Sequence, residues 1–228
     1  MSARLGWAGN LFKNRLSFWT SVCSKGNFVR MRAAFKEWAV VVDALGRGEQ
    51  IIILRKGGIA EEQGEFQVAQ SRFLLFPTLF HQQREGVIPA AQARFEEMAR
   101  GFPPRDILRL EYWAEVIFSR KITSLEEALS LRGLHIWSDE IIAQRFDWGG
   151  NLSNFVLGVR VFRLPGRIEV PMLESYGGCK SWVELETDVA TNQAAPVLSD
   201  ASFKFKLDQC RTALNLQEEP AWAVSGPV

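Results

Sequence analysis

Two cations, Arg55 and Lys56, directly precede Gly57 and Gly58 at the end of the apolar run Ile51–Leu54. Glycines let a phosphate or a base approach the backbone, and the cations supply charge and, from arginine, forked hydrogen-bond donors. The GxxxxGK[ST] spacing of a P-loop is absent. The pattern favours a binding surface, although a hairpin with solvated cations would have the same sequence.

A second polar group, containing Thr78 and His81, follows the apolar run Phe73–Phe76. Short apolar runs bounded by Gly and Pro are typical of buried strands, and the core behind such strands holds their ends rigidly. We therefore predict that Thr78 and His81 face Arg55 and Lys56. His81 could act there as a hydrogen-bonding reader or as a general base, and a solvated loop histidine is the alternative.

The segment 107–122 alternates between apolar and polar residues with period two, which predicts a long strand. Glu111, Trp113 and Glu115 share the side opposite its apolar face. A carboxylate and an indole there could read a base by hydrogen bonding and stacking, or could form an ordinary polar outer face. In an enzyme, His81 would pair with Glu111 or Glu115 for acid–base chemistry.

Trp137, next to His135 in a segment that continues with Asp139, is the other candidate for stacking on a base. Helix capping by Ser138 or Asp139 explains these polar residues more simply than a metal site. The chain has only two histidines, no GxSxG sequence, and no Glu-x-Lys or Asp-x-Lys of the common metal-dependent nucleases. We expect no metal site and no cofactor, and no motif names a reaction.

The composition is that of a soluble globular protein, with 228 residues, 47% hydrophobic and 23% charged residues, and a net charge of +1. This charge gives no global electrostatic case for nucleic acid. The three cysteines show no CxxC spacing, which predicts free thiols in a reducing cytoplasm. No apolar run approaches eighteen residues, so we expect no membrane segment.

The chain divides into three regions. Residues 1–30 contain cations but no acidic residue and are expected to be a poorly ordered extension. Residues 31–187 are expected to form a single globular domain. Residues 188–228 are expected to be a partly ordered C-terminal extension.

The apolar spacing predicts a helix over 33–45 that is stopped by Gly46 and Gly48. The other predicted helices are 90–100, 124–132 and 139–146. The predicted strands are 50–55, 73–76, 107–122, 155–164 and 182–186, with 167–172 as a weaker strand and 203–216 as a short helix or strand. This order predicts an α+β fold with a mixed, strongly curved sheet or a small β-barrel, flanked by helices.

Four segments of the chain resemble, in order, a bacterial family known as domain of unknown function 1802. They are FKEWAVVVDALGRGEQIIILRKGGI, FLLFPTLFHQQ, LHIWSDEIIAQRFDW and VLGVRVFRL. The resemblance runs from about Phe35 to Leu185. Members of that family are sometimes joined to restriction-endonuclease-like modules, which implies a role in DNA-related defence and a nuclease as a partner protein.

The order of elements is also similar to the ASCH group of PUA-like domains, in which a short helix leads through a glycine turn into a strand that ends in a basic residue. Gly48 matches the turn glycine and Arg55 the basic strand end. The insertion 60–105 departs from the group. The resemblance implies binding of RNA or of modified bases, and hydrolysis of modified nucleosides in some members, whose Lys, Thr and Glu have no residue-by-residue counterpart here.

The leading hypothesis is a module that binds RNA or DNA or senses a modified base, with Arg55, Lys56 and His81 as ligand contacts and Trp113 or Trp137 as the stacking residue. The alternatives are a small hydrolase of modified nucleosides, an atypical nuclease, or a protein-interaction subunit of a defence complex.

Overall fold

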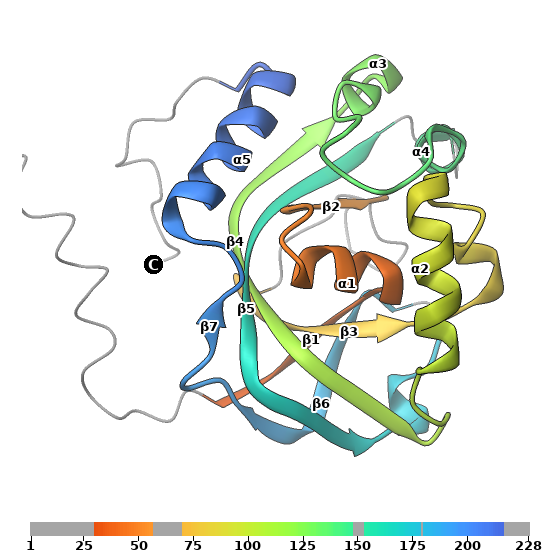
Figure 1. The fold of residues 1–228 in the computed structure, drawn as a ribbon, viewed down its shortest axis with the longest axis vertical. Helices are drawn as coiled ribbons and strands as arrows, with labels where there is room; N and C mark the ends of the chain where they lie inside the picture. The colour runs from red at the N-terminus through yellow and green to blue at the C-terminus, as the bar shows by residue number, and fades with distance from the viewer. Residues whose placement is uncertain (1–29, 57–69, 148–152, 179, 217–228) are drawn as a thin grey trace, which may run out of the picture.

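The computed structural model describes residues 30–56, 70–147, 153–178 and 180–216 (Figure 1). The strands are β1 (Arg30–Trp38), β2 (Ile52–Arg55), β3 (Arg72–Thr78), β4 (Ile107–Ile122), β5 (Asn154–Pro171), β6 (Trp182–Ala190) and β7 (Ala195–Pro196). The helices are α1 (Ala39–Gly46), α2 (Pro89–Arg100), α3 (Leu125–Leu129), α4 (Asp139–Asp147) and α5 (Asp200–Ala213), with 3-10 turns η1 (His81–Gln83) and η3 (Glu174–Tyr176).

The seven strands form one mixed sheet in the order β2-β5-β4-β3-β1-β6, with β7 paired to β5. β1 and β3 run parallel, and the other described pairs are antiparallel. Among the described residues β2 and β6 are not paired with each other, so the sheet is open. The predicted α+β class with a mixed, strongly curved sheet is confirmed.

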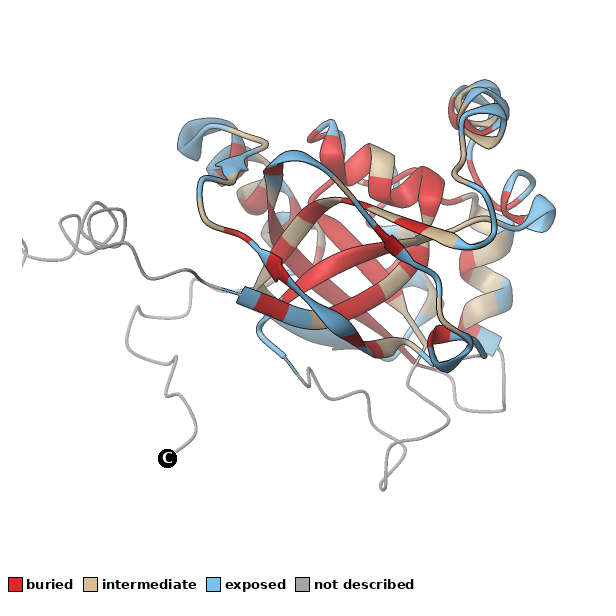
Figure 2. Cartoon of the chain, turned by 90° about the horizontal axis from the view of Figure 1, so that it is seen from below, coloured by how far each residue is buried: buried red, intermediate tan, exposed pale blue. Residues whose placement is uncertain are grey.

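The sheet curls around helix α1, which lies on its concave side (Figure 1). Seen from below, the buried residues gather inside the curve and most exposed residues face outward (Figure 2). Val41 and Leu45 of α1 belong to the same buried cluster as Phe73 and Leu75 of β3. A second cluster, which contains Leu74 and Phe76, lies on the other face of β3. Both faces of β3 are therefore buried, as its continuous apolar sequence predicted.

The predicted helix over 33–45 is wrong in its first half, because residues 30–38 form β1 and the helix begins only at Ala39. β1 lies between β3 and β6 and pairs with both. Its two faces are also both buried, with Phe35 in the inner cluster and Ala34 in the outer one. A strand buried on both faces loses the simple alternation of period two, and its apolar spacing resembles that of a helix.

The two longest strands, β4 and β5, pair with each other along most of the curved sheet. The register of this pair shifts between Leu110 and Tyr112 and again between Val116 and Phe118, and such bulges bend a strand and increase its twist. The phenyl ring of Phe118 packs directly against the backbone of Gly158 in β5. A Cβ added at this position would lie 2.0 Å from the ring, so the contact requires glycine. The segments 155–164 and 167–172, predicted as two strands, are one strand, β5.

Helix α5 packs against the inner core through residues spaced three or four apart. Phe203, Leu207, Cys210 and Leu214 are all buried in the cluster that contains α1. Ser199 caps the helix by accepting a hydrogen bond from the backbone N–H of Ser202 at 3.2 Å. Burial raises the pKa of the Cys210 thiol to about 11.

The predicted extension 1–30 lies outside the described residues except for Arg30, which begins β1. Of the region 188–228, the structure describes residues up to 216, and these include β7 and α5. Within the described ranges, no helix has the length and apolar character needed to cross a membrane.

Candidate functional site

The ends of β1, β2 and β3 lie together. Arg55, the last residue of β2, donates a hydrogen bond to the carbonyl oxygen of Lys36, and its guanidinium lies 4.4 Å from the ring centroid of Phe35. Thr78, the last residue of β3, donates from Oγ1 to the carbonyl oxygen of Glu37 at 3.1 Å. Two of the residues predicted for ligand binding therefore contact the backbone of β1.

Glu37, which sequence reasoning missed, is the buried acid of this group, with 1% of its surface exposed. Its Oε1 accepts a hydrogen bond from the backbone N–H of Trp38 at 2.7 Å, and its Oε2 has no hydrogen-bond partner among the described residues. The available signal was a glutamate inside a long apolar stretch, because a buried carboxylate is rare unless it has partners.

Arg145 of α4 completes the group by lying over the ring of Trp38, 4.4 Å from the ring centroid, and by donating to the carbonyl oxygen of Leu54 at 3.3 Å. Burial lowers the pKa of Arg145 to about 10, with the Glu37 carboxylate acting in the opposite direction. We call Glu37, Arg55, Thr78, Gln83 and Arg145 the strand-end cluster.

The other residues predicted to lie around Arg55 do not form one group. Lys56 donates to the carbonyl oxygen of Phe146 at 2.6 Å, and burial lowers the pKa of its ammonium group. Gly57 and Gly58 lie outside the described residues. His81 is exposed at the start of η1, and the next buried side chain there is Gln83, whose Nε2 lies 3.5 Å from the hydroxyl oxygen of Thr78. The cations of the strand-end cluster thus connect β2 to β1 and α4.

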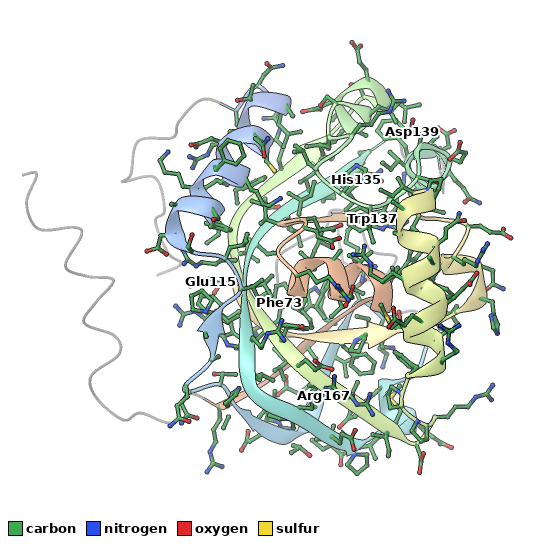
Figure 3. The ribbon with its side chains drawn as sticks, viewed as in Figure 1. Phe73, Glu115, His135, Trp137, Asp139 and Arg167 are labelled. Carbon is green, nitrogen blue, oxygen red and sulfur yellow. The ribbon has the colours of Figure 1, made fainter. Side chains whose placement is uncertain are left out.

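The two tryptophans predicted to stack on a base occupy different environments. Trp137 has 1% of its surface exposed and belongs to the inner core (Figure 3). Trp113 is half-buried on the outer face of β4 and stacks on Phe162, with ring centroids 4.1 Å apart and planes 6° apart. One flat side of the Trp113 indole is therefore already occupied by a phenyl ring.

The proposed acid–base pair does not form with Glu115. Glu115 accepts a hydrogen bond from Arg72, at the start of β3, at 2.8 Å, whereas His81 follows the end of that strand. A strand of this length spans about 20 Å. Glu111 forms an ion pair with Arg167 at 3.2 Å, and no described contact joins it to His81.

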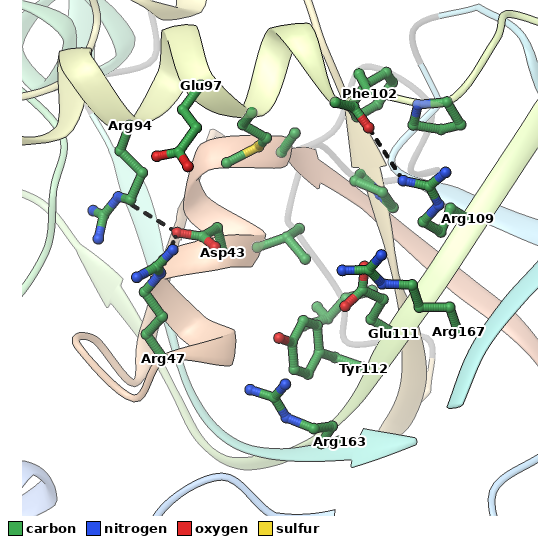
Figure 4. A pocket seen from close by; sticks show the side chains of 17 residues that line it. Asp43, Arg47, Arg94, Glu97, Phe102, Arg109, Glu111, Tyr112, Arg163 and Arg167 are labelled. Atoms are coloured by element: carbon green, nitrogen blue, oxygen red, sulfur yellow. Dashed lines mark hydrogen bonds and ion pairs between the residues drawn. The ribbon is translucent and has the colours of Figure 1, made fainter. Parts of the chain in front are cut away.

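A cavity of about 490 Å³ opens between α1, α2 and the long pair β4–β5 (Figure 4). Five arginines line it: Arg47, Arg94, Arg109, Arg163 and Arg167. Three carboxylates line it: Asp43, Glu97 and Glu111. The aromatic side chains of Phe102 and Tyr112 complete the wall, and we call this cavity the arginine pocket.

The Domain of unknown function (DUF1802) family model matches residues 34–209. The chain belongs to this family. Among curated proteins no sequence matches the DUF1802 domain described here.

Three solved structures to which this chain is similar are those of ZmASCH from Zymomonas mobilis. The wild-type structure has 12% sequence identity and a TM-score of 0.37, covering 77% of this chain and 92% of the other. A serine-to-alanine mutant has 12% identity and a TM-score of 0.36, covering 79% and 97% of the two chains. A tyrosine-to-phenylalanine mutant has 13% identity and a TM-score of 0.37, covering 77% and 95%.

The charges of the arginine pocket are unevenly paired. Asp43 lies 2.8 Å from Arg47 and 3.4 Å from Arg94. Arg163 differs from the other four arginines, because no described carboxylate pairs with it. It donates to the carbonyl oxygen of Gly46 at 3.1 Å and lies 5.2 Å from the ring centroid of Tyr112.

Gly46, Tyr112 and Arg163 fix one wall of the pocket. A Cβ added at Gly46 would be 2.3 Å from the ring of Tyr112, so the close approach of α1 to β4 requires glycine at this position. Burial raises the pKa of the Tyr112 phenol, which stays neutral and can donate or accept a hydrogen bond.

Sequence reasoning missed the arginine pocket because no single segment encodes it. Arg94 comes from α2, Arg109 from β4, Arg163 from β5, and Arg47 follows α1. The only local signal is the alternation of β4, which places Glu111 on the polar side of the strand. The pairing of Tyr112 with Arg163 appears only in the register of the folded sheet.

Proposed function

We propose that this DUF1802 domain binds a single strand of nucleic acid and takes one of its nucleotides into the arginine pocket. The observation that carries the proposal is a cavity of about 490 Å³ whose lining has five arginines against three carboxylates. This volume lies within the range of small-molecule and cofactor sites. Glu49 pairs with Arg94 and Glu169 pairs with Arg109, so Arg163 is the arginine of this lining that has no described carboxylate partner, and it favours an anionic ligand.

The side chains present match the two chemical parts of a nucleotide. Guanidinium groups bind phosphate oxygens with forked donors, and Arg163 and Arg167 are exposed on β5 for this contact. The partly exposed ring of Phe102 offers apolar surface for a base. The strand-end cluster contributes less to this proposal, because Arg55 and Arg145 donate to backbone carbonyl oxygens and are not part of the lining of the arginine pocket.

The test measures fluorescence anisotropy of the full chain with single-stranded and duplex RNA and DNA, with and without common base modifications, at two salt concentrations. We expect saturable binding to single strands that weakens with salt, by about 0.7 logarithmic units per tenfold rise in salt for each phosphate contact. Arg163→Ala should weaken binding about tenfold, as expected for loss of one charge-assisted contact.

The chain offers a matched pair of variants, Arg167→Ala on β5 and Arg72→Ala on β3, because each arginine pairs with a glutamate of β4. Arg167 pairs with Glu111 beside the pocket, and Arg72 pairs with Glu115 outside it. Arg167→Ala should weaken binding, and Arg72→Ala should leave it unchanged. Equal effects of the two variants, or flat curves for every nucleic acid, would contradict the proposal and would favour a protein partner or nucleoside hydrolysis.

A further inference from the structure

Glu97 is the carboxylate of the arginine pocket that has no described ion pair or hydrogen bond. Asp43 pairs with Arg47, and Glu111 pairs with Arg167. Glu97, on the exposed side of α2, influences Arg47 only through its charge. Both of its oxygens are therefore open to hydrogen-bond donors from a ligand.

The two charged groups of the pocket without a described ion pair, Glu97 and Arg163, lie apart. Figure 4 shows Glu97 descending from α2 at one edge of the cavity, and Arg163 rising from β5 at the opposite edge. A ligand phosphate would be repelled by the carboxylate and attracted by the guanidinium. A nucleotide bound in the orientation that these charges favour would have its phosphate toward β5 and its base toward α2.

We propose that the arginine pocket reads guanine, with Glu97 accepting hydrogen bonds from the base. This inference rests on the proposed function and adds the identity of the base. The Watson–Crick edge of guanine presents two adjacent donors, the N1–H and the amino group at C2, which match the two oxygens of a carboxylate.

The other bases fit the carboxylate less well. Adenine and cytosine present one amino group beside a ring nitrogen that accepts, and uracil presents one N–H between two carbonyl oxygens. In each case a lone pair of the base would face an oxygen of Glu97, which costs affinity. Inosine lacks only the amino group at C2 and is the closest control for guanosine.

The test compares five single-stranded RNA oligonucleotides that differ only in one central nucleotide, which is guanosine, inosine, adenosine, cytidine or uridine. Each is titrated with the full chain and with the Glu97→Gln, Glu96→Gln and Arg163→Ala variants. We expect guanosine to bind about tenfold or more tightly than inosine, as one side of a bidentate contact is lost. Glu97→Gln should reduce that ratio to near one.

Glu96→Gln is the matched control, because Glu96 lies next to Glu97 on the same helix but pairs with Arg84 outside the pocket. It should keep the preference for guanosine. Arg163→Ala should lower the affinity for all five oligonucleotides by a similar factor. The ratio of the affinities for guanosine and inosine should stay unchanged. Equal affinity for the five, or a preference that survives Glu97→Gln, would overturn the reading of guanine alone. Absence of binding to every oligonucleotide would overturn the proposed function as well.

Discussion

The strand-end cluster and the arginine pocket contain the same kinds of residue but present them differently. In the strand-end cluster, Arg55 and Arg145 donate to carbonyl oxygens and lie over aromatic rings. In the arginine pocket, Arg163 also donates to a carbonyl oxygen and lies near an aromatic ring, but it and the other four guanidinium groups line an open cavity of about 490 Å³. Residue type alone does not separate a structural cation from a binding cation. The open space in front of the guanidinium groups does.

On the proposed function, the strand-end cluster serves stability and the arginine pocket serves ligand binding. A buried polar group stabilises only when its partners are present, so substitutions in the strand-end cluster should lower the free energy of unfolding. Exposed ion pairs contribute little to stability, so Arg167, whose side chain is 69% exposed, should be replaceable without unfolding the domain.

The largest effect is expected for Trp137→Ala. Trp137 is 1% exposed in the inner core, and removal of so large a buried side chain should lower the free energy of unfolding by about 3–5 kcal/mol. Urea unfolding monitored by circular dichroism measures the change. A stable variant that loses nucleic-acid binding would instead return Trp137 to the role of a stacking residue.

The next effect is on the pH dependence of stability. Burial lowers the pKa of His135 to about 4, with the nearby Asp139 acting in the opposite direction. In the unfolded chain the pKa is about 6.5, so between these values the unfolded state binds more protons and stability falls as the pH falls. The native state should lose up to about 3 kcal/mol of unfolding free energy between pH 7 and pH 4 from this residue.

His135→Phe removes this titrating group and keeps a similar volume. The difference in unfolding free energy between pH 7 and pH 4 should shrink accordingly in urea titrations of the variant. An unchanged difference would show that the acid sensitivity of the domain arises elsewhere.

Arg55→Ala should lower the free energy of unfolding by about 1.5–3 kcal/mol, because the hydrogen bond from its guanidinium to the Lys36 carbonyl is lost. Its affinity for nucleic acid should remain that of the unchanged chain. Parallel urea unfolding and anisotropy titrations check both statements. A stable Arg55→Ala variant with weakened binding would reverse the assignment of the two regions.

The smallest effect on stability is expected for the exposed arginines of β3 and β5. The side chains of Arg72 and Arg167 are 53% and 69% exposed in their ion pairs with Glu115 and Glu111. Alanine at either position should change the free energy of unfolding by less than about 1 kcal/mol. A larger loss for Arg167→Ala would indicate that the wall of the pocket depends on this ion pair.

Local periodicity predicted much of the fold. The alternation over 107–122 gave β4 with its observed bounds, and Pro89 with Arg100 delimit a helix, α2, that was predicted over 90–100. The prediction of these elements succeeds because one face of each is buried and the other is more exposed. β1 was misassigned because pairing with β3 and β6 buries both of its faces and removes that contrast.

The candidate sites were less predictable than the fold. The sequence places Thr78 and Arg55 at the ends of strands but does not show that their side chains bind the backbone of β1. Glu37 was overlooked because it lies within a largely apolar segment. The arginine pocket depends on the register of β4 and β5 and on the contact of Gly46 with Tyr112. Such information arises from tertiary pairing, and no short sequence window contains it.

The most direct test of the division between the two regions is to titrate one single-stranded RNA with the full chain and with the Arg163→Ala and Arg55→Ala variants, at equal salt and after confirming that each variant is folded. We predict that Arg163→Ala weakens binding about tenfold and that Arg55→Ala binds as the unchanged chain does. Weakened binding by Arg55→Ala together with unchanged binding by Arg163→Ala would contradict this division.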